Sequence, residues 1–160
     1  MKRFLLSLAT LFFLYSCEKN TYVEETAELP KVLEITADFT PNNNFSYLYT
    51  LPTNIVVYES DIILVYLEEQ VVNGNESVWT LLPQSFFSDL GTFQYSYNHT
   101  YYDINLMMYG NFNLQLLPTN LTLGKRFRIA ILPAAYAEQN PEAMSDLNAL
   151  MRDTQTFTNF

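Results

Sequence analysis

From residue 31 onward the chain alternates apolar and polar residues with a period of two, and this pattern limits its fold more than any other feature. In KVLEITADF the apolar side chains fall at every second position: Leu33, Ile35, Ala37 and Phe39. The segments FSYLYTL, TFQYSYN and RFRIAIL repeat the pattern. Successive side chains of a strand point to opposite faces of a sheet, so each segment predicts a strand with one buried and one wetter face.

Three further segments predict strands of a different kind. DIILVYLEEQVV and YDINLMMY are apolar at nearly every position. Strands that are covered on both faces read as continuous apolar runs, so these two are expected to be central strands. In the third segment, VWTLLPQSFF, Pro83 marks an edge or a bulge because proline cannot donate to the hydrogen-bond ladder.

The turn signals complete a prediction of the fold class. All four glycines fall between strand candidates, and Asn73-Gly74 is the strongest hairpin signal, joining residues 61–72 to residues 78–87. Many short strands with regular turns indicate a sandwich or a barrel. We favour an all-β, antiparallel β-sandwich of roughly seven to eight strands, with Trp79 and the alternating aromatic residues between its sheets.

One short C-terminal helix is predicted near residues 141–152. Asn140 can cap it, Pro141 suits its first position, and Glu142 favours the positive end of the helix dipole. Its apolar stripe consists of Ala143, Leu147, Leu150 and Met151. We expect this helix to pack across an open end of the sandwich, so that residues 31–160 form one domain.

The start of the chain, MKRFLLSLATLFFLYSC, has the three-part layout of a cleavable secretory signal. A basic start precedes an apolar run from Phe4 to Leu14, and the small residue Ser16 follows. The run is shorter than the about 20 residues that a membrane-spanning helix needs. Residues 1–16 are therefore predicted to be a signal peptide. Cys17 is the only cysteine, so it cannot form a disulfide within the chain.

The residues around that cysteine, Leu14-Tyr15-Ser16-Cys17, resemble the lipobox of bacterial lipoproteins, although Tyr15 stands where a small residue is common. The resemblance implies that Cys17 carries a diacylglycerol thioether and becomes the first residue after cleavage. Stable anchoring takes at least two acyl chains, which such lipidation supplies. The other interpretation of Cys17 is a buried thiol that packs as a small hydrophobe.

Residues 17–30, CEKNTYVEETAELP, contain four glutamates and few apolar side chains, and they predict a solvated acidic tether. The expected location is the outer membrane, with the protein held there by its lipid. In lipoproteins, acidic residues just after the cysteine can direct export to the cell surface; Glu18 fits that signal and Lys19 does not. The periplasmic and cell-surface faces both stay open.

Composition argues against several functions. The formal net charge is −9, and an acidic surface repels phosphate backbones, so no nucleic-acid partner is expected. His99 is the only histidine, and a lone histidine at a strand end is far more often structural than catalytic. The sequence contains no Gly-x-Ser-x-Gly nucleophile motif, and one histidine with one cysteine cannot form a His/Cys metal cluster. Glu68 and Glu69 are adjacent on a predicted strand and point to opposite faces, so they cannot act on one glycosidic bond. We expect no enzyme activity, no cofactor and no metal, while a calcium site built from loop oxygens stays open.

Aromatic residues are the one enriched class, with 12 Tyr and 12 Phe. Core packing is the favoured interpretation, because most of them alternate with polar residues as core positions do. The other interpretation is a stacking platform for glycans. Four aromatic residues are hardest to place in a core and form the expected ligand-binding face: Tyr101, Tyr102, Tyr109 and Phe112.

The runs ESDIILVYLEE, VWTLLPQSFF, GTFQYSYNHT, DINLMMYGNFNL and FRIAILPAAYA occur in this order and cover most of residues 31–137. On these runs the chain resembles a family of uncharacterised lipoproteins from flavobacteria and other Bacteroidetes. Some of its relatives carry a collagen-like stretch after the lipidated cysteine, where this chain has the acidic tether. Some similar sequences are labelled dihydrolipoamide dehydrogenase, a chemistry that needs a dinucleotide fingerprint and a cysteine pair, neither of which this sequence contains.

These observations predict a lipid-anchored, non-catalytic envelope lipoprotein that acts as an interaction or structural module. It would contact the membrane through lipidated Cys17 and would bind an envelope protein or a glycan. The alternative is a glycan-binding surface lipoprotein.

Overall fold

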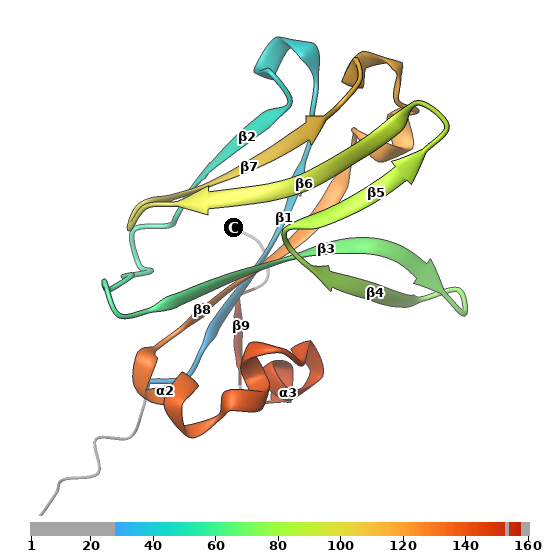
Figure 1. The fold of residues 1–160 in the computed structure, drawn as a ribbon. Helices are drawn as coiled ribbons and strands as arrows, with labels where there is room; N and C mark the ends of the chain where they lie inside the picture. Colours follow the sequence, from blue (N-terminus) through green and yellow to red (C-terminus); the bar gives the residue numbers. More distant parts are fainter. Residues whose placement is uncertain (1–27, 153, 158–160) are drawn as a thin grey trace, which may run out of the picture.

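The computed structural model describes residues 28–152 and 154–157, and nine strands in this part of the chain form two sheets packed face to face (Figure 1). The strands are β1 (Lys31–Ala37), β2 (Ser46–Thr50), β3 (Ile62–Val72), β4 (Glu76–Leu81), β5 (Gln84–Ser88), β6 (Gly91–His99), β7 (Asp103–Gly110), β8 (Lys125–Leu132) and β9 (Gln155–Phe157). Sheet A has the order β4-β3-β8-β1-β9, and sheet B has the order β2-β7-β6-β5. The predicted all-β sandwich is confirmed.

Every pairing is antiparallel except that of β9, which lies parallel to β1 at one edge of sheet A. Leu33 and Val65 both lie opposite Ile129, so one row of buried aliphatic side chains crosses the middle of sheet A. This row faces sheet B and forms part of the main core. The alternation in the sequence thus marks the inward-facing side of these strands, as expected.

Aromatic rings fill much of the space between the sheets. Phe39, Phe86, Phe93, Tyr95 and Phe127 contact one another, mostly edge to face. The buried Tyr95 hydroxyl donates a hydrogen bond to the Leu121 carbonyl, so this ring is satisfied at its polar end. Core packing is therefore the role of these rings.

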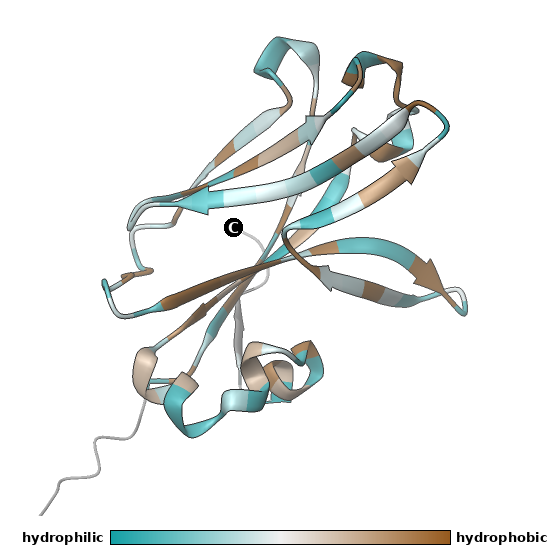
Figure 2. Ribbon diagram, viewed as in Figure 1, coloured by the Kyte–Doolittle hydropathy of each residue, from teal (hydrophilic) through white to brown (hydrophobic). Residues whose placement is uncertain are grey.

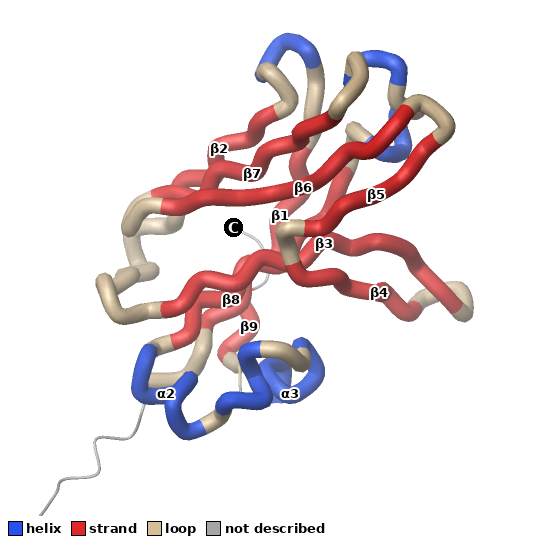
Figure 3. Tube along the Cα trace, viewed as in Figure 1, coloured by secondary structure: helices blue, strands red, loops and turns tan. Residues whose placement is uncertain are grey.

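A second core lies on the other face of sheet A. Helix α2 (Ala134–Gln139), the 3₁₀ helix η5 (Pro141–Met144) and helix α3 (Leu147–Arg152) cover this face, on the side away from sheet B (Figure 3). Tyr66 of β3 and Leu150 of α3 belong to this core. The strand β3 is consequently buried on both faces along its first half, which Figure 2 shows in brown, whereas β6 is mostly pale or teal.

The C-terminal region differs from the expectation in position and in shape. The short helix does not pack across an open end of the sandwich but against the outer face of sheet A. The predicted span 141–152 contains η5 and α3 with a break at Ser145–Asp146, and α2 precedes them. The break has a local cause, because the Asp146 carboxylate accepts a hydrogen bond of 2.8 Å from the Asn148 N–H and caps a new helical turn.

Two strand predictions are also corrected. Residues 78–87 do not form one strand: β4 belongs to sheet A and β5 to sheet B, and Leu82-Pro83 connects them. Proline interrupts the hydrogen-bond ladder, and the chain crosses to the other sheet there. The strand β7 is central within sheet B but is covered on one face only, since Tyr109 is exposed on the other.

Trp79 does not lie between the sheets. It is opposite Glu68 in the β3–β4 register and packs against the second core, on the outer face of sheet A.

The predicted hairpin at Asn73-Gly74 is confirmed. Both residues have positive φ values, 50° and 80°, and the Asn75 N–H closes the turn on the Val72 carbonyl at 3.2 Å.

Candidate functional site

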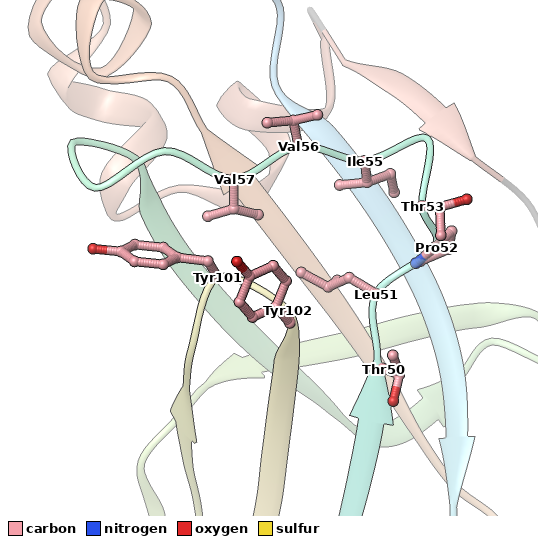
Figure 4. Close-up of a pocket in the computed structure, with 9 residues that line it drawn as sticks. All are labelled: Thr50, Leu51, Pro52, Thr53, Ile55, Val56, Val57, Tyr101 and Tyr102. Atoms are coloured by element: carbon pink, nitrogen blue, oxygen red, sulfur yellow. The ribbon is translucent and has the colours of Figure 1, made fainter.

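A pocket of about 480 Å³ opens at one end of the sandwich (Figure 4). The β2–β3 loop, residues 51–61, supplies most of its wall, and the β6–β7 turn supplies two tyrosines. Its lining residues are Thr50, Leu51, Pro52, Thr53, Ile55, Val56, Val57, Tyr101 and Tyr102. None of these nine described residues is charged, so the pocket offers an apolar surface with a few hydroxyl groups.

The long β2–β3 loop is held in place by burial and by hydrogen bonds of its own backbone. Leu51 and Ile55 are buried in the main core. The Ile55 N–H donates to the Pro52 carbonyl at 2.9 Å, and the Tyr58 N–H donates to the Asp61 carboxylate at 2.9 Å. A loop without regular structure is therefore fixed at both ends and in its middle.

The β6–β7 turn is fixed in a similar way. The Thr100 N–H donates to the Asp103 carbonyl at 2.9 Å, and the Thr100 hydroxyl donates to the Asp103 carboxylate at 2.9 Å. The Tyr102 N–H donates in turn to the Thr100 hydroxyl oxygen at 3.1 Å. The turn therefore holds Tyr101 and Tyr102 at the rim of the pocket, where their side chains are 48% and 74% exposed.

Figure 4 shows how the two segments face each other. The side chains of Leu51 and Val57 point toward the tyrosine side of the pocket, while Val56 points away. Val57 and the two tyrosines stay partly or largely exposed. The pocket is thus an open, preformed hollow with an apolar floor and an aromatic rim, a combination typical of sites that take up apolar groups.

The structure brings together two of the four aromatic residues expected to form one binding face. Tyr109 lies at the other end of β7, roughly 24 Å along the strand from Tyr102. Phe112 packs against the main core and is only partly exposed. The predicted face is therefore not one surface.

The sequence prediction missed the apolar half of the pocket. The run Ile55-Val56-Val57 belongs to no strand, although its composition is typical of one. An apolar run of this kind, enclosed by Pro52, Asn54 and the polar stretch Glu59–Asp61, is the signal from which a structured binding loop could be recognised.

A charged cluster lies on the outer face of sheet A. The Arg126 guanidinium bridges two carboxylates, at 3.0 Å from Glu34 and 2.5 Å from Glu68, and Arg128 contacts Glu34 at 2.7 Å. The Arg128 guanidinium also lies 4.1 Å from the centre of the Trp79 ring. These ion pairs explain how charged side chains can be partly buried next to the helical layer.

The network does not have the electrostatics of an acid–base pair. Partial burial alone would raise the pKa of Glu34, but the hydrogen bonds and charges of Arg128 and Arg126 outweigh it and lower this pKa. A general acid for glycoside cleavage needs a raised pKa instead. Glu69 is separate from this cluster, because it accepts a hydrogen bond from Thr80 at 2.7 Å. The arrangement is therefore that of a structural ion-pair network.

The remaining sequence candidates lie outside any chemical cluster. His99 is exposed at the end of β6, where it stacks on Tyr97 with 6.5 Å between ring centres. Within residues 28–152 and 154–157, acidic, histidine and cysteine side chains form no group of three able to hold a metal. In the same residues no helix is long and apolar enough to cross a membrane. Cys17, the signal peptide and most of the tether lie outside the described residues.

Comparison with known proteins adds no functional assignment to this geometry. No family model matches the chain, and neither a curated protein nor a solved structure is significantly similar to it.

Proposed function

We propose that this chain is a lipid-anchored, non-catalytic envelope lipoprotein that binds a partner protein through the tyrosine-rimmed pocket. The pocket itself is the observation that carries the proposal. Its floor is apolar and its rim presents two exposed tyrosines, Tyr101 and Tyr102. Aromatic anchors around an apolar centre are the typical composition of interaction hot spots.

The non-catalytic part of the proposal is supported by the chemistry of the lining. The lining offers hydroxyl groups of threonine and tyrosine, and it contains no aspartate, glutamate, histidine, lysine, arginine or cysteine. In the described part of the chain, Glu34 and Glu68 both form ion pairs with Arg126, and Glu34 pairs with Arg128 as well. Neither carboxylate is available to a substrate in the pocket.

The direction of the chain supports a partner close to the membrane. Lys31 and Ile63 both lie opposite Ile131, so β1 and β3 begin at the same end of sheet A. The β2–β3 loop leads directly into β3, which places the pocket at the end where the chain enters from the tether. Residues 17–30 can span at most roughly 50 Å. The tether would therefore hold this end of the sandwich near the bilayer, so that the pocket faces a partner close to the membrane.

Site-specific photocrosslinking in cells tests this proposal. The full-length chain would carry benzoylphenylalanine in place of Tyr102, and in a matched control in place of Val71, which is exposed on the β3–β4 hairpin. We expect a discrete crosslinked envelope protein from position 102 and none from position 71. Identical crosslinking patterns at both positions would contradict a pocket-mediated interaction.

Glycan binding is the second candidate function, and a different surface favours it. Sugar hydroxyls are recognised by side chains that both donate and accept hydrogen bonds, and the pocket presents no amide or carboxylate side chain for this. The outer face of sheet B does present amides, beside the exposed rings of Phe87 and Tyr109.

A further inference from the structure

The outer face of sheet B combines polar side chains with exposed rings in an arrangement distinct from that of the pocket. Register places Leu48, Asn105 and Asn98 in one row across the sheet, and Tyr109, Gln94 and Ser85 in another. On the area of the outer face that extends from these two rows to Phe87, the described outward-facing side chains bear no charge. Asp103 stands at one end of the face. In a chain of net charge −9, this face is suited to a neutral ligand.

Two exposed aromatic rings lie on either side of strand β6 on this face. Phe87 on β5 is 86% exposed and Tyr109 on β7 is 53% exposed, with β6 between them. Phe87 lies opposite Thr92, and Tyr109 lies opposite Gln94. Two strand spacings and two residues along the strand separate their Cα atoms by about 12 Å. Exposed rings grouped on one surface mark an interaction site, since isolated apolar residues rather than groups are the norm.

The amide side chains between the rings are already oriented by hydrogen bonds. Gln94 donates from Nε2 to the Ser85 hydroxyl at 3.1 Å, and Asn111 accepts the Thr92 N–H on Oδ1 at 3.0 Å. Within the described residues, Gln94 Oε1 and Asn111 Nδ2 form no hydrogen bond of their own. One acceptor and one donor therefore stand free in a shallow hollow of about 330 Å³ beside Tyr109.

From this geometry we infer that the outer face of sheet B binds a neutral oligosaccharide. The apolar faces of its sugar rings stack on Tyr109 and Phe87, while its hydroxyl groups bond to Gln94 and Asn111. An oligosaccharide has both kinds of surface and no net charge, as the site requires. A second copy of the chain fits less well, because the centre of a homodimer interface is more apolar than this row of amides and hydroxyls.

Binding assays with the full-length protein in detergent test this inference. The probes are immobilised neutral hexasaccharides of β-glucan, mannan and xylan, with a sulfated hexasaccharide as the charged comparison. We expect at least one neutral probe to bind, and the sulfated probe to bind more weakly. Tyr109→Ala and Phe87→Ala should each weaken binding about tenfold through lost stacking. Gln94→Ala should weaken it as well.

Two matched controls locate the site. Val71→Ala removes an exposed side chain from β3 of sheet A, outside this face, and Tyr102→Ala removes the pocket rim; both should leave glycan affinity unchanged. Thermal unfolding checks that every variant is folded. The inference is overturned if no neutral probe binds the folded protein, if binding survives the loss of both rings, or if Phe87→Ala abolishes self-association while glycans do not bind.

Discussion

The Leu51 N–H donates a hydrogen bond of 2.8 Å to the carbonyl oxygen of Tyr102, and this bond joins the two segments that form the pocket. Leu51 is buried in the main core, whereas the Tyr102 side chain is largely exposed. One end of the bond is thus fixed by packing, and the other end positions an exposed ring. The pocket is preformed for this reason, which lowers the entropy that a partner must overcome on binding.

Tyr102→Ala should abolish partner binding without destabilising the fold. The ring is exposed and its backbone hydrogen bonds do not depend on the side chain, so the free energy of unfolding should change by less than about 0.5 kcal/mol. Loss of crosslinked partner at an unchanged melting temperature is the expected result. Tyr58→Ala is the control, because Tyr58 is exposed on the same loop but does not line the pocket. Equal effects of both variants would contradict the pocket model.

The partly buried Tyr97 and the buried Tyr66 should respond differently to the loss of their hydroxyl groups. The Tyr97 hydroxyl donates to the Ile63 carbonyl at 2.8 Å, whereas the buried Tyr66 hydroxyl finds no hydrogen-bond partner among the described residues. Tyr97→Phe should lower the free energy of unfolding by about 1 kcal/mol. Tyr66→Phe removes an unsatisfied polar group and should leave stability equal or higher. Urea unfolding measures both, and a clear loss of stability in Tyr66→Phe would contradict the structure.

The sequence predicts those parts of the fold that depend on local pattern. Alternation identifies the strands, and Asn73-Gly74 identifies a hairpin, because both signals act within one segment. Alternation does not say which face meets which partner. The sequence therefore predicted Trp79 on the wrong face of sheet A, and it did not predict the helical layer that covers Leu64 and Tyr66.

The candidate sites show the same limit. Tyr102 and Tyr109 were expected on one binding face, yet Tyr102 directly precedes β7 and Tyr109 lies near the other end of that strand. The pocket unites residues 50–57 with the β6–β7 turn only because β2 and β7 are neighbours in sheet B. Phe87 is exposed because it points to the outer face of sheet B, whereas its neighbour Phe86 packs against the main core, and the chain enters sheet B only after the crossing at Pro83. These are consequences of strand order, which a local pattern does not contain.

Leu150→Ala should show that the helical layer contributes to the stability of sheet A. Leu150 is fully buried in the second core, so its truncation should cost about 3 kcal/mol of unfolding free energy. Leu116→Ala is the matched control, since Leu116 is exposed and its truncation should be nearly neutral. Denaturant unfolding compares the two variants. Equal midpoints would mean that the helices do not stabilise the sheet.

The ion pairs of Glu34 should make stability depend on pH in a defined direction. Arg128 and Arg126 lower the pKa of Glu34 from its ordinary value of 4.5 by more than partial burial raises it. When the pKa of a carboxyl group is lower in the folded state than in the unfolded state, its ionised form stabilises the fold at any pH above the unfolded-state pKa. This stabilisation is lost as the pH falls through the folded-state pKa. Glu34→Gln should therefore be less stable than the parent at pH 7, and the difference should shrink below pH 4.5. Glu59→Gln, at an exposed loop position, controls for the loss of a charge. A difference between Glu34→Gln and the parent that stays constant across pH would argue against this role of the network.

Cys17→Ala should abolish both lipid attachment and cleavage of the signal peptide. The chain has one cysteine, so a thioether-linked lipid has one possible site. Cells grown with labelled palmitate should label the parent, whereas the variant should remain an unlabelled precursor with residues 1–16 still attached. Tyr15→Ala is the control, because it introduces the small residue common at that place in lipoproteins and should preserve labelling. Mass spectrometry of the mature N-terminus completes the measurement, since a start at any residue other than a lipidated Cys17 would contradict the anchor.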